Sequence, residues 1–287
     1  MRKMIKSMLK RFGFRSKSTW PKLSDFKKKY LIDNVSIKSS KDTIHAIKLT
    51  IENRQKGAYM RFGDGDVLLM LGIDDMLHKA NKKMAKEMKE AMRFNRGILH
   101  KGFPIHSQLL GFEKGMIDGM HLVSDHEALK YLSVTYKYFD FKNTYTSFAL
   151  HYLATFQQDL CIDFLNFLKQ KSPIFVGNET IKPELVEKLF GNFHIKTPSN
   201  NSYQEIDRIE QELIQLLDQN QSQFQVVVVA MGCPGRIFQK RILKKGYNVY
   251  LFDFGSLLDA LNDDNSRLWI DLAGGASGLK DILNKLD

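Results

Sequence analysis

The chain has 287 residues, 43% of them hydrophobic and 11% aromatic, which suffices for one large core or two modest ones and excludes a disordered protein. No apolar run approaches the about 20 residues of a transmembrane helix, and no signal-peptide pattern follows the basic N-terminus, so we expect a cytoplasmic protein. Cys161 and Cys233 are too few for a disulfide framework.

The net charge of +11 is concentrated near the N-terminus. Residues 1–50 hold 14 Lys and Arg against three Asp, and the remaining residues balance at 29 basic and 29 acidic. The neutral body has no bulk attraction for polyanions, so nucleic acid is not the partner we expect.

Residues 1–45 are predicted to be a basic arm appended to the body. Apolar residues recur in it at three- and four-residue spacing, namely Met4, Ile5, Met8, Leu9 and Phe12. Basic residues occupy the other positions, as in a basic amphipathic helix. Residues 1–24 are therefore predicted to bind the anionic inner face of a membrane. A solvated basic tail is the alternative.

Residues 46–287 are predicted to form a single domain. A short apolar run over 58–62 predicts a strand that leads through a glycine-acid loop into a helix over 67–71. Methionines and alanines repeat with helical period over 74–94, which predicts a helix with its methionines in the core. Further elements are predicted as helices at 46–52 and 126–132, a strand at 97–100, and one or two buried helices within 143–168.

In the last 120 residues, strands and helices alternate clearly. Strands are predicted at 173–177, 193–196, 225–231 and 248–252, with helices after Asn178, at 203–217 and at 236–245. Gly191 and Gly246 are predicted to end two of these helices. Such alternation predicts an α/β fold with a Rossmann-like, mostly parallel sheet covered by helices, whose ligands bind beyond the carboxyl ends of the strands.

Two carboxylates follow the first predicted strand directly, in the loop Arg61-Phe-Gly-Asp-Gly-Asp66. Gly63 and Gly65 permit a tight backbone, and a pair of carboxylates can hold a hard cation such as Mn²⁺ or Mg²⁺ that also binds the phosphate oxygens of a nucleotide. Arg61 offers a second positive partner. The alternative for Asp66 is a structural one, as a cap of the following helix.

A second glycine turn, Gly232-Cys-Pro-Gly235, follows a buried strand, so free amides at the start of the next helix are predicted to face a phosphate beside Arg236. An ordinary strand-to-helix turn is the equal alternative. Asp253 and Asp259 follow the last strand and are candidates for a base or a sugar-hydroxyl acceptor, although capping would explain them equally. A nucleophilic Cys233 is not favoured, because no histidine is evidently paired with it.

Taken together, these segments resemble the GT-D-type glycosyltransferases, bacterial enzymes such as the glucosyltransferase that extends glycans on serine-rich adhesins. Arg61-Phe-Gly-Asp-Gly-Asp66 resembles the family's R-F-G-D-G-E segment, with Asp66 in place of the glutamate. Pro198-Ser-Asn-Asn-Ser-Tyr203 resembles P-x-x-N-A-[FY], and Val228 to Gly235 resembles its strand and glycine loop. Asp253-Phe-Gly-Ser-Leu-Leu-Asp259 is similar to D-I-G-H-x-D, except that Ser256 replaces the histidine and the acid falls one place later.

The resemblance covers roughly residues 43–275 and implies a UDP-sugar donor and a divalent metal, Mn²⁺ or Mg²⁺. It implies catalytic roles for Asp64, Asp66, Asp253 and Asp259, with Asp64 and Asp66 holding the metal. It also implies a nucleotide-sugar site, which comprises Arg61, Phe62, Gly63, Gly65, Asn201, Ser202, Gly232, Pro234, Gly235, Arg236 and Ser256. The acceptor is expected to be a glycan, a glycolipid or a glycoprotein.

Two other functions are compatible with the residues. The first is a peripheral membrane or nucleic-acid adaptor that binds through its basic arm. The second is a Rossmann-type methyltransferase, because the strand and loop of Val226–Gly235 loosely resemble a cofactor-binding segment. Only about 52 residues follow that loop, which is short for the remaining sheet of a methyltransferase.

Overall fold

The computed structural model describes residues 20–107, 109–110, 123–219, 223–264, 269–270 and 275–286. The amphipathic helix predicted around Met4 to Phe12 lies outside these ranges. Within them, no helix combines the length and the apolar character that crossing a bilayer requires.

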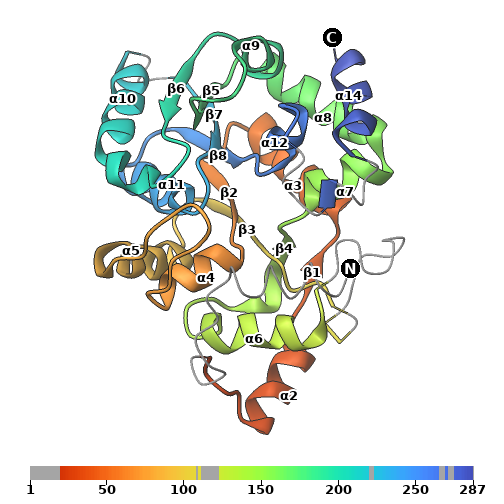
Figure 1. Cartoon of the computed structure of the whole chain (residues 1–287), viewed down its shortest axis with the longest axis vertical. Helices are drawn as coiled ribbons and strands as arrows, with labels where there is room; N and C mark the ends of the chain where they lie inside the picture. The colour runs from red at the N-terminus through yellow and green to blue at the C-terminus, as the bar shows by residue number, and fades with distance from the viewer. Residues whose placement is uncertain are drawn as a thin grey trace.

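One parallel sheet, in the order β1-β4-β3-β2-β8-β7-β5-β6, runs through the molecule (Figure 1). Its strands are β1 Ile37–Lys38, β2 Gly57–Arg61, β3 Ile98–Phe103, β4 Thr144–Thr146, β5 Ile174–Asn178, β6 His194–Thr197, β7 Gln225–Ala230 and β8 Val249–Asp253. The predicted α/β fold with a mostly parallel sheet is confirmed.

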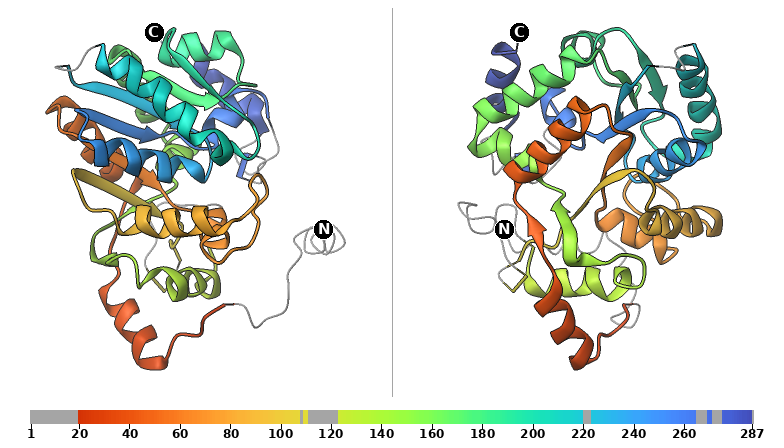
Figure 2. Two further views of the ribbon diagram at one scale, coloured as in Figure 1. Left: turned by 90° about the vertical axis from the view of Figure 1, so that its left-hand side faces the viewer. Right: turned by 180° about the vertical axis from the view of Figure 1, so that it is seen from behind.

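Helices cover both faces of the sheet, as the two layers in Figures 1 and 2 show. On the first face lie α4 Asp64–Met70, α5 Lys82–Arg93, α6 Asp125–Thr135, α10 Ile206–Asp218 and α11 Pro234–Lys245. On the second lie α3 Ser40–Glu52, α7 Ala149–Phe156, α8 Gln158–Gln170, α9 Pro183–Phe190, α12 Leu257–Leu261 and α14 Gly275–Asn284. Shorter or peripheral helices are α2 Asp25–Asn34, η1 Phe141–Asn143 and η2 Ser202–Glu205.

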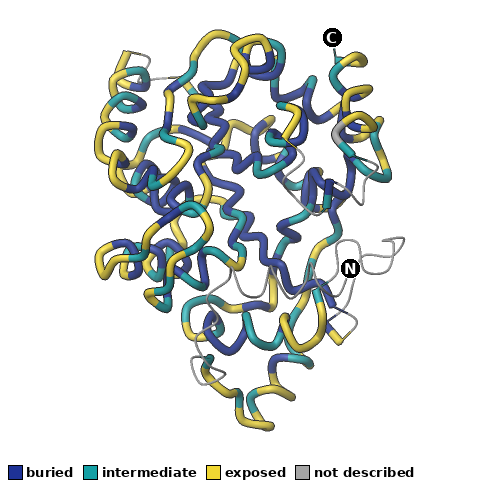
Figure 3. Tube along the Cα trace, viewed as in Figure 1, coloured by how far each residue is buried: buried dark blue, intermediate teal, exposed yellow. Residues whose placement is uncertain are grey.

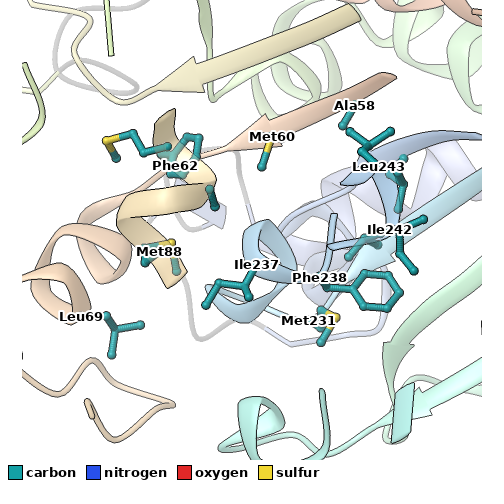
Figure 4. Close-up of a cluster of buried hydrophobic side chains, with 14 of the residues drawn as sticks. Ala58, Met60, Phe62, Leu69, Met88, Met231, Ile237, Phe238, Ile242 and Leu243 are labelled. Carbon is teal, nitrogen blue, oxygen red and sulfur yellow. The ribbon is translucent and has the colours of Figure 1, made fainter. Parts of the chain in front are cut away.

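The central strands are apolar on both sides because neither face meets water (Figure 3). Successive residues of β2 alternate between the layers: Ala58 and Met60 join the core under α5 and α11, whereas Tyr59 joins the opposite core. Figure 4 shows the first of these cores, where Met60 and Phe62 lie near Met88 of α5. Packing on both faces holds the sheet in place, and with it the loops that follow the carboxyl ends of its strands.

Glycines end two helices where the sequence predicts it. Gly191 follows α9 with φ of +86° and Gly246 follows α11 with φ of +91°, a backbone region that favours glycine. Pro183 lies in the first turn of α9, also as predicted. These local signals explain why the last third of the chain was the easiest to predict.

The helix predicted over 74–94 is shorter than expected. It begins only at Lys82, because Asn81 caps α5 by accepting a hydrogen bond from the Met84 amide at 2.8 Å. The preceding residues form a loop, and Met76, predicted to lie in the core, is 72% exposed. The methionines of α5 itself, Met84, Met88 and Met92, are buried as predicted.

The folded body begins before residue 46. Residues that we assigned to the arm form α2, β1 and the start of α3, and β1 pairs with β4 at Ile37 and Lys38. The Ser39 hydroxyl caps α3 by accepting from the Asp42 amide at 3.0 Å. Part of the basic segment is therefore built into the sheet.

Candidate active site

The candidate site lies at the carboxyl ends of the three central strands, β2, β8 and β7. Arg61 is the last residue of β2 and Asp253 the last of β8. Asp66 and Arg236 stand in the first turns of α4 and α11, the helices that follow β2 and β7. The helices after β2 and β7 pack on the first face of the sheet, whereas α12, after β8, packs on the second. Ligands of parallel sheets bind where neighbouring connections diverge in this way.

The four charged side chains form one buried network. Arg236 Nη1 lies 3.1 Å from Asp253 Oδ2, Arg236 Nε lies 3.6 Å from Asp66 Oδ1, and Arg61 Nη1 lies 3.7 Å from Asp253 Oδ1. Two positive and two negative charges thus balance one another out of water. Strand order brings them together, because β2 and β8 are neighbours although about 190 residues separate them in the chain.

The network leaves hydrogen-bonding capacity unused. Asp66 Oδ1, Asp253 Oδ2 and Arg236 Nε are buried and make no hydrogen bond, although each lies near an opposite charge. Most buried polar atoms in proteins do have a hydrogen-bond partner. Three such atoms within one cluster make it a candidate for binding a polar ligand or an ion.

Burial also perturbs Asp66. Desolvation raises the pKa of this carboxyl from 3.8 to about 6, against the opposing effects of Arg236 and of a hydrogen bond from the Gly63 amide. Perturbed carboxyls of this kind cluster at functional sites. Asp66 therefore stays mostly ionised at neutral pH and becomes neutral in mild acid.

Asp66 takes the capping role that was one of its two predicted alternatives. Its Oδ2 accepts a hydrogen bond from the amide of Gly63, the N-cap residue of α4, at 2.6 Å. Asp64 is the first residue of α4 and is exposed. Residues two apart in a helix do not face each other, so these carboxylates leave the first turn in different directions. Joint metal binding by them stays a prediction.

Arg61 is held in place by the chain around it. Its Nε donates to the Ser147 carbonyl at 2.6 Å, and its guanidinium covers Gly255. A Cβ at Gly255 would lie 1.2 Å from Arg61 Nη1, and the φ of Gly255 is +70°, so only glycine fits. Phe62, the next residue, is buried and stacks on Phe103 with ring centroids 5.2 Å apart.

Ser256 and Asp259 lie beyond the network. The Ser256 hydroxyl accepts from Trp269 Nε1 at 3.0 Å and lies 2.9 Å from His151 Nε2. This series of contacts extends to Arg61, whose Nη2 is 3.5 Å from His151 Nδ1. Asp259 is half-buried in the first turn of α12 and does not belong to the four-residue network.

The glycine turn before α11 does not present the amides we expected. The Gly235 amide donates to the Gly232 carbonyl at 3.0 Å, the Arg236 amide donates to the Cys233 carbonyl at 3.2 Å, and Pro234 has no N–H. The amides of Gly235 and Arg236 are therefore engaged within the turn, as in the ordinary strand-to-helix turn that was the equal alternative. What the turn does contribute is Arg236, whose Nη1 also donates to the Gly232 carbonyl at 2.5 Å.

Asn201 and Ser202 brace the loop between α4 and α5. The Asn201 side chain accepts from the Lys79 amide at 2.9 Å, and its own amide donates to the Leu77 carbonyl. Asn201 has φ of +53°, and the Ser202 hydroxyl donates to the Met231 carbonyl at 3.2 Å. Asn201 and Ser202 therefore connect this loop to the end of β7 and the turn before α11.

Sequence reasoning missed two residues of this loop, Asp75 and His78. Asp75 Oδ2 accepts a hydrogen bond from the Cys233 thiol at 3.1 Å and lies 3.1 Å from His78 Nδ1. The spacing of an acid and a histidine three residues apart was visible, but a helix was predicted over it. Burial raises the pKa of the Cys233 thiol well above its ordinary value, so Cys233 is not an activated nucleophile.

Comparison with known proteins places the fold. No family model and no curated protein sequence matches the chain. A solved structure described as the highly conserved domain of unknown function 1792, with a distinct glycosyltransferase fold, is similar with a TM-score of 0.60 and 16% identity, over 88% of this chain and 87% of that one. A structure described as a new glycosyltransferase of this domain type from Streptococcus sanguinis is similar with a TM-score of 0.58 and 17% identity, over 84% and 86%.

At this identity the likeness establishes a shared fold. It extends over most of both chains. The resemblance seen in four sequence segments is thereby supported at the level of the fold.

Proposed function

We propose that this chain is a glycosyltransferase that uses a UDP-sugar donor. The observation that carries the proposal is the buried network of Arg61, Asp66, Arg236 and Asp253, at the ligand-binding edge of a sheet whose fold is shared with structures described as glycosyltransferases. Arg236 Nε is an unused donor that suits a phosphate oxygen of a nucleotide diphosphate, and the unused oxygens of Asp66 and Asp253 suit a cation or a sugar hydroxyl.

The two arginines would bind the diphosphate. A guanidinium offers several N–H donors in a fixed fork that matches phosphate oxygens, and Arg236 Nε has no hydrogen-bond partner. Arg61 is anchored through Ser147, so its position does not depend on the donor. Binding of the donor would redistribute the contacts of Arg236 among Asp66, Asp253 and phosphate.

A divalent metal, Mn²⁺ or Mg²⁺, would be held by Asp64 and Asp66. Carboxylate oxygens are the ligands that these hard cations prefer, and Asp66 Oδ1 is buried without a hydrogen bond, so this oxygen can serve as one ligand. The exposed Asp64 would have to turn toward it to supply a second. When bound, the metal would neutralise charge on the departing diphosphate. Asp253 and Asp259 are the proposed acceptors for a sugar or acceptor hydroxyl, Asp253 because it lies within the network.

The acceptor is proposed to be a glycan, glycolipid or glycoprotein at the inner face of a membrane. The basic segment that includes residues 1–24 continues into α2, which carries Lys27, Lys28 and Lys29 and an 83% exposed Phe26. Lysines contribute about 1 kcal/mol each near an anionic surface, and an exposed aromatic ring can enter the interface. These features support a peripheral position in the cytoplasm.

Release of UDP tests the proposal. The full chain is incubated with a panel of UDP-sugars and either Mn²⁺ or EDTA, and UDP is quantified. Turnover should need the metal, and Asp64→Asn should reduce it by roughly 100-fold, the scale of losing one charge-stabilising group in an active site. Because Asp64 is exposed, the fold should survive the change.

A matched control is Asp159→Asn, an exposed acid in the first turn of α8 on the opposite face of the sheet. It should keep full turnover. Complete activity in EDTA, or in Asp64→Asn, would eliminate the metal role. Absence of UDP release with every sugar, from protein that unfolds cooperatively, would remove the transferase proposal itself.

A further inference from the structure

Three metal-ligating side chains converge beside the charged network. Asp75 and His78 come from the loop between α4 and α5, and Cys233 directly precedes α11. Asp75 Oδ2 lies 3.1 Å from both Cys233 Sγ and His78 Nδ1, and one donor atom of each residue lies within 4.8 Å of the others. It is the one group of at least three His, Cys, Asp or Glu donors this close together in the part of the chain that the structure describes.

The carboxylate of Asp75 is positioned by the backbone. Its Oδ1 accepts hydrogen bonds from the Leu77 amide at 2.7 Å and the His78 amide at 2.5 Å. These bonds fix the carboxylate, with Oδ2 directed at Cys233 and both oxygens near His78 Nδ1, at 3.2 Å for Oδ1 and 3.1 Å for Oδ2. Ligands oriented by such outer hydrogen bonds are typical of metal sites.

The His78 ring lies between Asp75 and Ser202. The Ser202 hydroxyl donates to the Met231 carbonyl and lies 3.4 Å from His78 Nε2. His78 Nδ1 lies 3.1 Å from Asp75 Oδ2 and donates to this carboxylate when it carries the ring proton. With the proton on Nε2 instead, the lone pair of Nδ1 would be free to bind a metal ion beside the carboxylate.

Two glycines pack closely against the cluster. A Cβ at Gly65 would lie 2.7 Å from Cys233 Sγ and 2.9 Å from Asp75 Oδ2, and a Cβ at Gly232 would lie 3.0 Å from His78 Cε1. Both glycines therefore permit the acidic loop and the turn before α11 to approach the cluster closely. His78 is only 4% exposed, so the site is shielded from bulk water.

We propose that Asp75, His78 and Cys233 bind a zinc-class divalent cation. One oxygen, one nitrogen and one sulfur suit Zn²⁺, whereas Mg²⁺ and Mn²⁺ prefer oxygen alone. A tetrahedral zinc with bonds of about 2.0 to 2.3 Å needs its donors roughly 3.3 to 3.6 Å apart, so small movements of these side chains would admit the ion. On binding, the thiol loses its proton to the solvent, and the fourth position is left for water.

The ion would tie the loop of residues 71–81 to the start of α11. Gly65 packs against the same cluster, so the ion would also help to hold the loop that carries Asp64 and Asp66. This role is separate from the metal of the proposed transferase, which is held by oxygens of Asp64 and Asp66. The inference therefore goes beyond the proposed function and does not depend on it.

Cobalt binding tests the site without any donor or turnover. Co²⁺ is titrated into the full, tag-free chain after treatment with a chelator, and the near-ultraviolet absorption of a cobalt–thiolate bond is followed. One equivalent should produce the band, one equivalent of Zn²⁺ should remove it, and Cys233→Ser should abolish it. Cys161→Ser is the matched control, because Cys161 is buried in α8 outside the cluster and should leave the band unchanged.

Two further variants separate this site from the transferase metal. Asp64→Asn should keep the cobalt–thiolate band even where it abolishes turnover, and His78→Gln should lose it. Thermal unfolding of each variant reports whether it folds, and zinc should raise the Tm of the wild type but not of Cys233→Ser. A folded protein that gives no thiolate band, or a band that survives Cys233→Ser, overturns the proposal.

Discussion

Replacing Gly255 by alanine should displace Arg61 and destabilise the protein. The new Cβ would lie 1.2 Å from Arg61 Nη1, so the guanidinium must leave its place beside Asp253 and give up its bond to the Ser147 carbonyl. A charged hydrogen bond contributes about 1.5 to 3 kcal/mol. A left-handed backbone adds about 1 to 2 kcal/mol for any residue with a Cβ. The expected loss is therefore about 2.5 to 5 kcal/mol in the free energy of unfolding.

Urea denaturation measures this loss, and Gly72→Ala supplies the control. Gly72 has φ of +77°, but a Cβ added there would meet no atom within 4 Å, so only the backbone cost of about 1 to 2 kcal/mol should appear. In a double variant with Arg61→Ala, the clash is gone, and Gly255→Ala should cost no more than Gly72→Ala. Equal losses for the two single glycine variants would refute the position assigned to Arg61.

Three other predictions concern pH, ion pairs and backbone packing. The pKa of Asp66 is raised from 3.8 to about 6, so its contribution to stability is fully present below the unfolded value and is lost as the pH rises through about 6. Relative to Asp66→Asn, the wild type should gain about 1 kcal/mol in unfolding free energy between pH 7 and pH 5, and a flat difference across this window would contradict the burial of the carboxylate. Arg241→Gln should cost about 2 to 3 kcal/mol in urea, because Arg241 bonds Glu87 of α5 at 2.8 Å and Asp207 of α10 at 2.6 Å, whereas the exposed Arg208→Gln should cost under about 1 kcal/mol. Comparable losses for the two arginines would show that burial does not decide the effect. Gly57→Ala should abolish soluble expression, since its Cβ would lie 2.0 Å from the Ile98 carbonyl in the neighbouring strand, while Gly63→Ala, with 3.7 Å to its nearest atom, should be tolerated. Soluble Gly57→Ala protein with an unchanged Tm would contradict the register of β2 and β3.

The order of strands and helices was largely predictable because each signal is local. Buried runs such as that of β7 and the glycine after α11 depend on a few adjacent residues. The two short strands β1 and β4 were missed, because two or three residues give no period to detect. The loop before α5 was mistaken for helix, since the hydrogen bonds of Asp75 and Asn81 override a periodicity that Met76 continues by coincidence.

The residues of the candidate site could be predicted from the sequence, but the ion pairs that they form could not. Asp66, Arg236 and Asp253 were identified because they come after predicted strands, and Arg61 because it ends one and begins the segment that resembles R-F-G-D-G-E. Which of them pair depends on β8 lying next to β2, and strand order does not follow from local patterns. The cluster of Asp75, His78 and Cys233 was hidden for the same reason, since Cys233 lies 158 residues from Asp75.

The pairing of β2 with β8 has a consequence for biosynthesis. Ala58 lies opposite Leu251, so one side of β2 has no neighbour until about 190 further residues have left the ribosome. At about 5 to 20 residues per second, that interval is roughly 10 to 40 s. During it, the nascent chain would expose an open strand edge rich in apolar side chains, which makes it a natural client for chaperones.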